Sequence, residues 1–258
     1  MAFRSANLER LVKFNSASSC DLVDRYQLFL QAQAAESASK PSARAFAPSS
    51  IRCKRKQWFR LRGTEPDILD RWDTALNYTA KLGTACHRIL QNDLSVMFGQ
   101  DWISVPDYLA DNPIPFKYTL KADTESLETL ISIENPPVRF ACDGIVKLNN
   151  KIYLVEIKTC DFSSFRELCG PKPNHIDQVK GYCTLLGLSN VLFIYMDRQY
   201  GDIKVFEYSV NQSDKDNMLK MFIEITELAD AGIAPDRIDW KDYECTNCKY
   251  KIKCKQWG

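Results

Sequence analysis

The chain has 258 residues, of which 45% are hydrophobic and 26% charged, and its formal net charge is +1. This length allows one large domain or two small ones, with enough apolar residues for a substantial core. The near-neutral charge excludes binding of nucleic acid through bulk positive charge, although a local basic groove is enough to attract phosphates. The sequence has no apolar run that could span a bilayer and no apolar N-terminal stretch of a secretory signal. We therefore expect a cytoplasmic protein without a membrane partner.

The N-terminal part is predicted to be a helical region followed by a linker. The residue pattern is helical from Ala6 to about Glu36, and residues 37–50 are rich in Ser, Ala and Pro. We expect residues 1–47 to form this region and linker, and residues 48–258 to form one α/β domain.

A basic run with aromatic residues follows, from Arg52 to Arg62. Its interleaved Trp58 and Phe59 are typical of a surface that holds a phosphate backbone and stacks bases. A solvated helix face would give the same composition. The sequence leaves both alternatives open.

The rest of the chain alternates between helical and strand patterns. Apolar spacing predicts helices over 73–98, 174–188 and 214–231, and strands over 138–148, 151–159, 190–197 and 203–210. Asn149-Asn150 is predicted to be the two-residue loop of a hairpin. This order indicates a single α/β unit rather than a repeat array.

The hairpin places two carboxylates together. Counting outward from Asn149-Asn150 puts Asp143 opposite Glu156, with Lys158 on the same face as Glu156. Like charges that face each other across a ladder destabilise it, so a divalent cation between them is the natural explanation. Two solvated charges on an outer face are the alternative, because a Glu-x-Lys string is common by itself.

The motifs in this region resemble those of one nuclease family. The similarity is to the RecB-type branch of the PD-(D/E)-x-K nucleases, and it rests on Asp143-Gly144, Glu156-Ile157-Lys158, Gln178-x-x-x-Tyr182 and the upstream Gly83-x-x-x-His87. It implies a restriction-endonuclease-like core, in which a central mixed sheet is flanked by helices. It also implies that Mg²⁺ or Mn²⁺ is bound by His87, Asp143, Glu156 and the Ile157 carbonyl. Lys158 would be the catalytic lysine, and Gln178 and Tyr182 would line the catalytic site and help hold the substrate strand.

Ten cysteines are many for a cytosolic chain and point towards metal binding. Three of them, Cys245, Cys248 and Cys254, lie in a short lysine-rich tail that has little apolar surface to bury them. We choose Cys53 as the fourth ligand, because it also lies in a basic run. Zinc and an iron–sulfur cluster both accept four thiolates. The other cysteines are expected to be small core residues, namely Cys20, Cys86, Cys142, Cys160, Cys169 and Cys183.

The order of the four cysteines along the chain resembles that of known iron–sulfur proteins, which favours an iron–sulfur cluster over zinc. One cysteine before the nuclease core and Cys-x-x-Cys-x-x-x-x-x-Cys after it are similar to the iron–sulfur subset of RecB-type nucleases, which includes the AddB helicase–nucleases and the small CRISPR-associated exonucleases. The resemblance implies a [4Fe–4S] cluster that joins the two ends of the domain and acts as a staple.

The expected function is therefore that of a metal-dependent DNA nuclease, an exonuclease or flap-type nuclease on single-stranded DNA ends that uses metal-activated water. The alternative is a non-catalytic iron–sulfur DNA-binding or adaptor subunit of a repair, recombination or CRISPR adaptation complex. A helicase or an integrase is a plausible partner for so small a chain.

Overall fold

A computed structural model of the chain describes residues 21–39, 43–67, 74–122, 128–239, 242–246 and 248–257. The chain divides into two compact units, Met1–Pro41 with Ile68–Lys81, and Ser42–Asp67 with Leu82–Gly258. The first unit contains helix α2 (Asp21–Ser39) and the beginning of α4 (Thr74–Phe98). The predicted helix before residue 21 and residues 40–42 of the predicted linker lie outside the described residues. The boundary at residue 47 stays a prediction.

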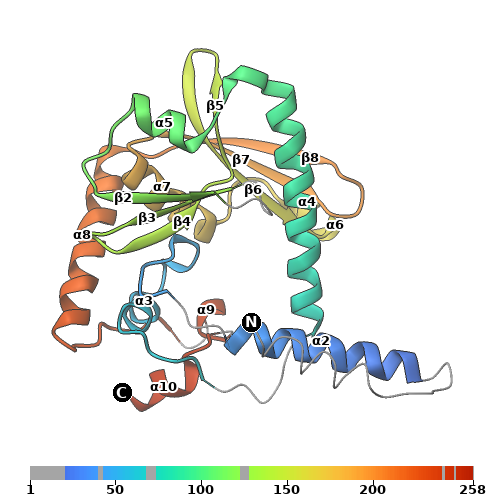
Figure 1. Cartoon of the computed structure of the whole chain (residues 1–258), viewed down its shortest axis with the longest axis vertical. Helices are drawn as coiled ribbons and strands as arrows, with labels where there is room; N and C mark the ends of the chain where they lie inside the picture. Colours follow the sequence, from blue (N-terminus) through green and yellow to red (C-terminus); the bar gives the residue numbers. More distant parts are fainter. Residues whose placement is uncertain are drawn as a thin grey trace. The chain divides into compact units, whose positions relative to one another are not determined.

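A five-stranded mixed sheet forms the centre of the second unit (Figure 1). Its strands, in spatial order, are β1 (Trp102–Ile103), β5 (Gly144–Leu148), β6 (Lys151–Cys160), β7 (Asn190–Asp197) and β8 (Ile203–Ser209). Strands β6 and β7 are parallel, and the other neighbours are antiparallel.

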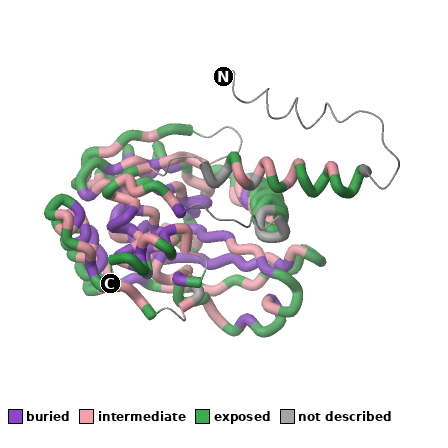
Figure 2. Tube along the Cα trace, turned by 90° about the horizontal axis from the view of Figure 1, so that it is seen from below, coloured by how far each residue is buried: buried purple, intermediate pink, exposed green. Residues whose placement is uncertain are grey.

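Helices cover both faces of this sheet. Side chains alternate along β6, so Val155 and Ile157 pack with Leu90 and Leu94 of α4 on one face. On the other face Leu154 joins the main hydrophobic core. That core includes buried residues of α7 (Pro173–Leu186) and α8 (Gln212–Asp230), and the central strands are the most continuously buried part of the chain (Figure 2). The predicted mixed sheet flanked by helices is confirmed.

The hairpin between β5 and β6 has the predicted two-residue loop. Asn149 and Asn150 have φ values of 50° and 60°, as a type I′ turn requires. Leu148 pairs with Lys151, and Gly144 pairs with Val155. The register therefore brings Asp143, the residue before Gly144, to the level of Glu156.

The predicted strand 138–148 is wrong in one respect, because the structure divides it into two strands. Strand β4 (Val138–Ala141) pairs with β3 (Thr129–Ile133) in a separate sheet with β2 (Tyr118–Ala122), whereas β5 pairs with β6. The chain passes from one set of partners to the other at Cys142-Asp143. Asp143 consequently lies in a bend between two sheets.

The remaining helical segments connect or flank these sheets. They are η1 (Pro48–Ser50), α3 (Lys54–Leu61), η2 (Gly99–Asp101), α5 (Val105–Asp111), α6 (Phe162–Glu167), α9 (Tyr243–Thr246) and α10 (Lys251–Gln256). Among the described helices, none is both long and apolar enough to cross a membrane.

The packing of helix α3 shows whether the basic run is a base-stacking surface or an ordinary helix face. Trp58 and Phe59 are only 1% and 2% exposed and belong to the core, so neither can stack bases. Lys54 and Lys56 form ion pairs with glutamates of the same unit, at 2.7 and 3.2 Å. The basic run is therefore the partly buried face of a packed helix.

Candidate metal centre and cysteine pocket

Two hydrogen bonds fix the bend at Asp143. Its Oδ2 accepts a hydrogen bond from the Ile157 amide at 2.5 Å, and its carbonyl accepts one from Gln91 Nε2 at 2.6 Å. A side chain at Gly144 would collide with the Trp102 ring, so the residue after Asp143 has to be glycine. The Asp143-Gly144 motif is thus explained by local packing as well as by chemistry.

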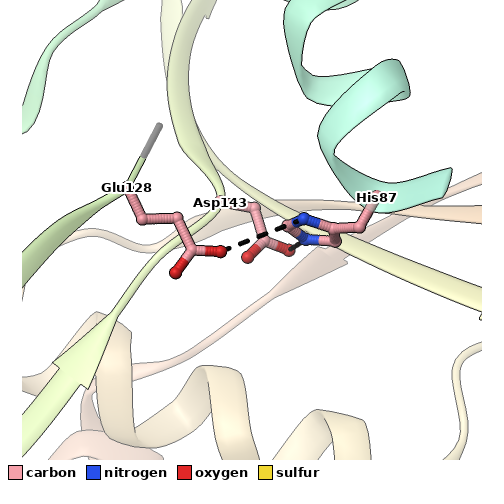
Figure 3. Close-up of side chains that lie close together, drawn as sticks. All are labelled: His87, Glu128 and Asp143. Carbon is pink, nitrogen blue, oxygen red and sulfur yellow. Dashed lines mark ion pairs between the residues drawn. The ribbon is translucent and has the colours of Figure 1, made fainter. Parts of the chain in front are cut away.

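Helix α4 brings His87 to this bend. A Cβ atom at Gly83 would lie only 3.1 Å from Thr159 Oγ1 of β6, so glycine permits the helix to approach the strand closely. His87 Nε2 lies 2.9 Å from Asp143 Oδ2, and its Nδ1 lies 3.9 Å from Glu128 Oε1. One ligand atom from each of these side chains lies within 4.8 Å of the other two (Figure 3).

The electrostatics of this group favour a cation. Burial lowers the pKa of His87, but the hydrogen bond and charge of Asp143 and the charge of Glu128 raise it more, so the net shift is upwards. An imidazole and two carboxylates are a ligand set that Mg²⁺ or Mn²⁺ accepts. The structure thus contains a candidate divalent metal site.

Glu156 is a nearly fully buried carboxylate, with an exposed fraction of 1%. Its Oε1 lies 2.5 Å from Lys158 Nζ, whereas Oε2 is buried and has no hydrogen-bond partner among the described residues. Burial raises the pKa of Glu156 to about 7, although the charge of Lys158 opposes this shift. A buried oxygen without a partner is costly, and a cation would satisfy it.

A chain of side chains holds Lys158 in place. Its Nζ donates to Gln178 Oε1 at 3.1 Å, and Gln178 Nε2 donates to the Tyr182 hydroxyl at 2.8 Å. The Tyr182 ring stacks on Phe140 at 4.9 Å. Burial alone would lower the pKa of Lys158, but Glu156 and then Asp143 raise it, so the net shift is upwards and the ammonium stays charged.

The predicted residues therefore form a network of two groups that meet at the Ile157 backbone, with His87 and Asp143 in one and Glu156, Lys158, Gln178 and Tyr182 in the other. An open pocket of about 340 Å³ adjoins it, lined by Gly83, Thr84, His87, Glu128, Ile157, Lys158 and Thr159. Glu128 is not among the residues predicted from sequence, and its acidity is the only signal that could have indicated it. His175 lies beside the network rather than in the metal group, with Nδ1 2.7 Å from the Tyr195 hydroxyl.

The four chosen cysteines line one small pocket, although Cys53 is far from the other three in sequence. The C-terminal tail reaches α3 through aromatic contacts, with Phe59 and Tyr250 stacked at 5.1 Å. Asp67 Oδ2 also accepts a hydrogen bond from the Ile252 amide at 2.6 Å. These contacts bring Cys245, Cys248 and Cys254 to Cys53, which is the N-cap residue of α3.

The pocket disfavours thiolates in the absence of a cation. Burial, followed by the charges of the other three cysteines, raises the pKa of Cys245 to about 11. Burial also raises the pKa of Cys53 and Cys248.

Of the cysteines predicted to be core residues, Cys142, Cys160 and Cys183 are buried. Cys86 is only partly buried, and the prediction was wrong for Cys169, which is exposed. Cys20 lies outside the described residues.

Comparison with known proteins gives distant structural similarities only. No protein-family model and no curated protein matches the sequence. The crystal structure of SSO0001 is 17% identical, with a TM-score of 0.49, and the match covers 89% of this chain and 95% of that one. An alkaline exonuclease (LHK-Exo) from Laribacter hongkongensis is 11% identical, with a TM-score of 0.48, and the match covers 76% of this chain and 93% of that one. Similarities of this size establish neither a shared family nor a shared activity.

Proposed function

We propose that this chain is a metal-dependent DNA nuclease of the PD-(D/E)-x-K type, similar to the RecB branch. One observation carries the proposal. Asp143, Glu156 and Lys158 converge with His87 in one network, in which a buried Glu156 oxygen lacks a hydrogen-bond partner. A structural ion-pair network would satisfy that oxygen, whereas a cation site leaves it free for the metal.

The ligand set for Mg²⁺ or Mn²⁺ would be His87, Glu128, Asp143, Glu156 and the Ile157 carbonyl. When bound, the metal would supply an activated water and stabilise charge on the scissile phosphate. His87 and Glu128 extend the set on the α4 side of the Asp143 bend.

Lys158 has the clearest role among the residues that do not bind metal. Glu156 and Gln178 hold its ammonium group at the edge of the pocket. There it would donate a hydrogen bond to the attacking water or to a phosphate oxygen and orient it for in-line attack. Gln178 and Tyr182 position Lys158 rather than contact the reacting atoms.

The substrate in this proposal is single-stranded DNA with a free end, cleaved as by an exonuclease, and a helicase or an integrase would be the partner. The alternative is a non-catalytic DNA-binding or adaptor subunit. The intact acid–lysine set favours the enzyme, because a binding module has no use for a buried carboxylate oxygen without a partner.

We also propose a [4Fe–4S] cluster at Cys53, Cys245, Cys248 and Cys254. The four cysteines line one small pocket, and four thiolates suit zinc as well as an iron–sulfur cluster. The resemblance of the cysteine spacing to that of iron–sulfur nucleases supports the cluster over zinc, and the cluster would staple the tail to α3.

Anaerobically purified protein, incubated with Mn²⁺ and either linear or circular single-stranded DNA, tests this function. An exonuclease releases nucleotides from the end-labelled linear substrate and leaves the circle intact. Cleavage of both substrates would replace the exonuclease proposal with an endonuclease. Binding without cleavage of either would favour the non-catalytic alternative.

A further inference from the structure

Two aromatic side chains are exposed together where β6 and β7 end. Phe162 is 36% and Tyr200 is 63% exposed, and their rings meet edge to face at 5.1 Å. The Arg166 guanidinium lies over the Phe162 ring at 5.7 Å. Single exposed apolar residues are ordinary, but two aromatic rings in contact with an arginine form a surface of definite chemistry. We call Phe162, Tyr200 and Arg166 the aromatic platform.

The backbone beneath the platform is held firmly on the α6 side. Asp161 caps the start of α6 by accepting from the Ser164 amide at 2.9 Å. At the other end of α6, Lys204 Nζ donates to the carbonyls of Phe165, Arg166 and Leu168 at 2.7, 3.2 and 3.0 Å. The segment that carries Phe162 and Arg166 is thereby fixed at both ends.

The turn that carries Tyr200 is equally well held. Asp197 is fully buried, and its carboxylate accepts hydrogen bonds from the Gln199 and Tyr200 amides at 3.1 and 3.0 Å. The Arg198 amide donates to the Cys160 carbonyl at 3.0 Å, which ties this turn to the end of β6. Rings on such a preorganised backbone lose little conformational entropy when they bind a ligand.

The platform continues the strand that carries the candidate catalytic residues. Phe162 follows Lys158 by four residues, so at about 3.3 Å per residue it begins within roughly 13 Å of Lys158. Between them lies Thr159, which lines the candidate metal pocket. A polymer that left this pocket towards the end of β6 would come near the platform.

Three cations lie near the platform, together with the exposed carboxylate of Asp161. Arg166 and Lys172 are exposed and Arg198 is partly exposed. No carboxylate of the described residues lies within 4.0 Å of the charged group of any of the three. Lys172 and Arg198 both act on the thiol of Cys160, which places them at the end of β6. These three cations suit phosphates, whereas an apolar protein partner would not need them.

We propose that Phe162 and Tyr200 stack on unpaired bases of a single-stranded nucleic acid whose phosphates contact Arg166, Lys172 and Arg198. This inference rests on the proposed function and deepens it, since it assigns a surface for the single strand beside the pocket. Stacking requires base faces that a duplex does not offer, and it tolerates any sequence because every base has such a face.

Fluorescence anisotropy of the full-length protein tests the platform. The probes are labelled oligothymidylate and a blunt duplex of the same length, with EDTA present to prevent metal-dependent hydrolysis. We expect Phe162→Leu and Tyr200→Leu to bind the single strand roughly 5- to 150-fold more weakly than wild type. Binding to the duplex should change little. Thermal melting of each variant verifies that it is folded.

Aromatic replacements at the same positions are the matched controls. Phe162→Trp and Tyr200→Phe keep a stacking ring and should bind the single strand as wild type does. Leucine variants that bind normally, aromatic replacements as weak as the leucine variants, or a wild-type protein that binds no single strand would each overturn the platform. Normal cleavage together with normal binding by the leucine variants would refute the proposed role of the platform and leave the nuclease proposal standing. Ring-dependent binding without any cleavage would support it and count against the nuclease.

Discussion

A substitution at Gln91 should change the metal affinity of the protein while leaving its stability nearly unchanged. It lies one helical turn after His87 on α4, is 4% exposed and donates to the Asp143 carbonyl at 2.6 Å. Its own Oε1 is buried without a hydrogen-bond partner among the described residues. Gln91→Leu removes the donor that fixes the Asp143 bend and leaves a side chain of similar size.

The two polar consequences of Gln91→Leu oppose each other. The Asp143 carbonyl loses its buried donor, which costs about 1–3 kcal/mol. The unpartnered Gln91 oxygen disappears at the same time, which recovers a similar amount, so we expect the free energy of unfolding to change by no more than about 1 kcal/mol. Metal affinity should respond far more, because groups that orient metal ligands typically contribute 10- to 100-fold.

Urea unfolding and calorimetric titration with Mn²⁺ measure these two quantities on the same samples. We expect Gln91→Leu to unfold near the wild-type midpoint and to bind Mn²⁺ roughly 10- to 100-fold more weakly. Asn92→Leu, an exposed position on the same helix, is the control and should change neither. Wild-type Mn²⁺ affinity in Gln91→Leu would refute the role of Gln91 in holding Asp143.

Three further predictions address the metal, the lysine and the cysteines. Mn²⁺ at about 100 times its dissociation constant should stabilise the wild type by about 2.7 kcal/mol, and thermal denaturation should show no such gain for Asp143→Asn. Gln178→Leu removes one of the two groups that hold Lys158 and should slow DNA cleavage by about 10²-fold with Mn²⁺ affinity unchanged; equal losses in both titration and cleavage would contradict a positioning role. If the proposed cluster is present, Cys53→Ser should lose its iron and its visible absorbance, whereas retained stoichiometric iron would exclude Cys53 as a ligand.

The hairpin and its consequences could be predicted from sequence because they follow from local rules. Two adjacent asparagines tolerate the left-handed conformation that a type I′ turn needs, and their φ values are 50° and 60° in the structure. Once the loop is fixed, a period of two places Asp143 at the level of Glu156, and the observed register agrees.

Other features depend on tertiary partners that no local pattern encodes. The strand break at Cys142 arises because β4 and β5 pair in different sheets. The sequence makes Trp58 and Phe59 candidates for base stacking, but both are buried in the hydrophobic core. Glu128 reaches His87 from a segment whose sequence shows nothing but acidity. Each of these would require knowledge of which distant element packs against which.

Cleavage of end-labelled single-stranded DNA by wild type and Glu156→Gln, with Mn²⁺ and with EDTA, tests whether the chain is a metal-dependent nuclease that acts through Glu156. The glutamine keeps an oxygen for Lys158 but removes the buried negative charge of Glu156. We expect Mn²⁺-dependent cleavage by the wild type and none by a folded Glu156→Gln protein. Equal cleavage by both proteins, or wild-type cleavage that persists in EDTA, would contradict it.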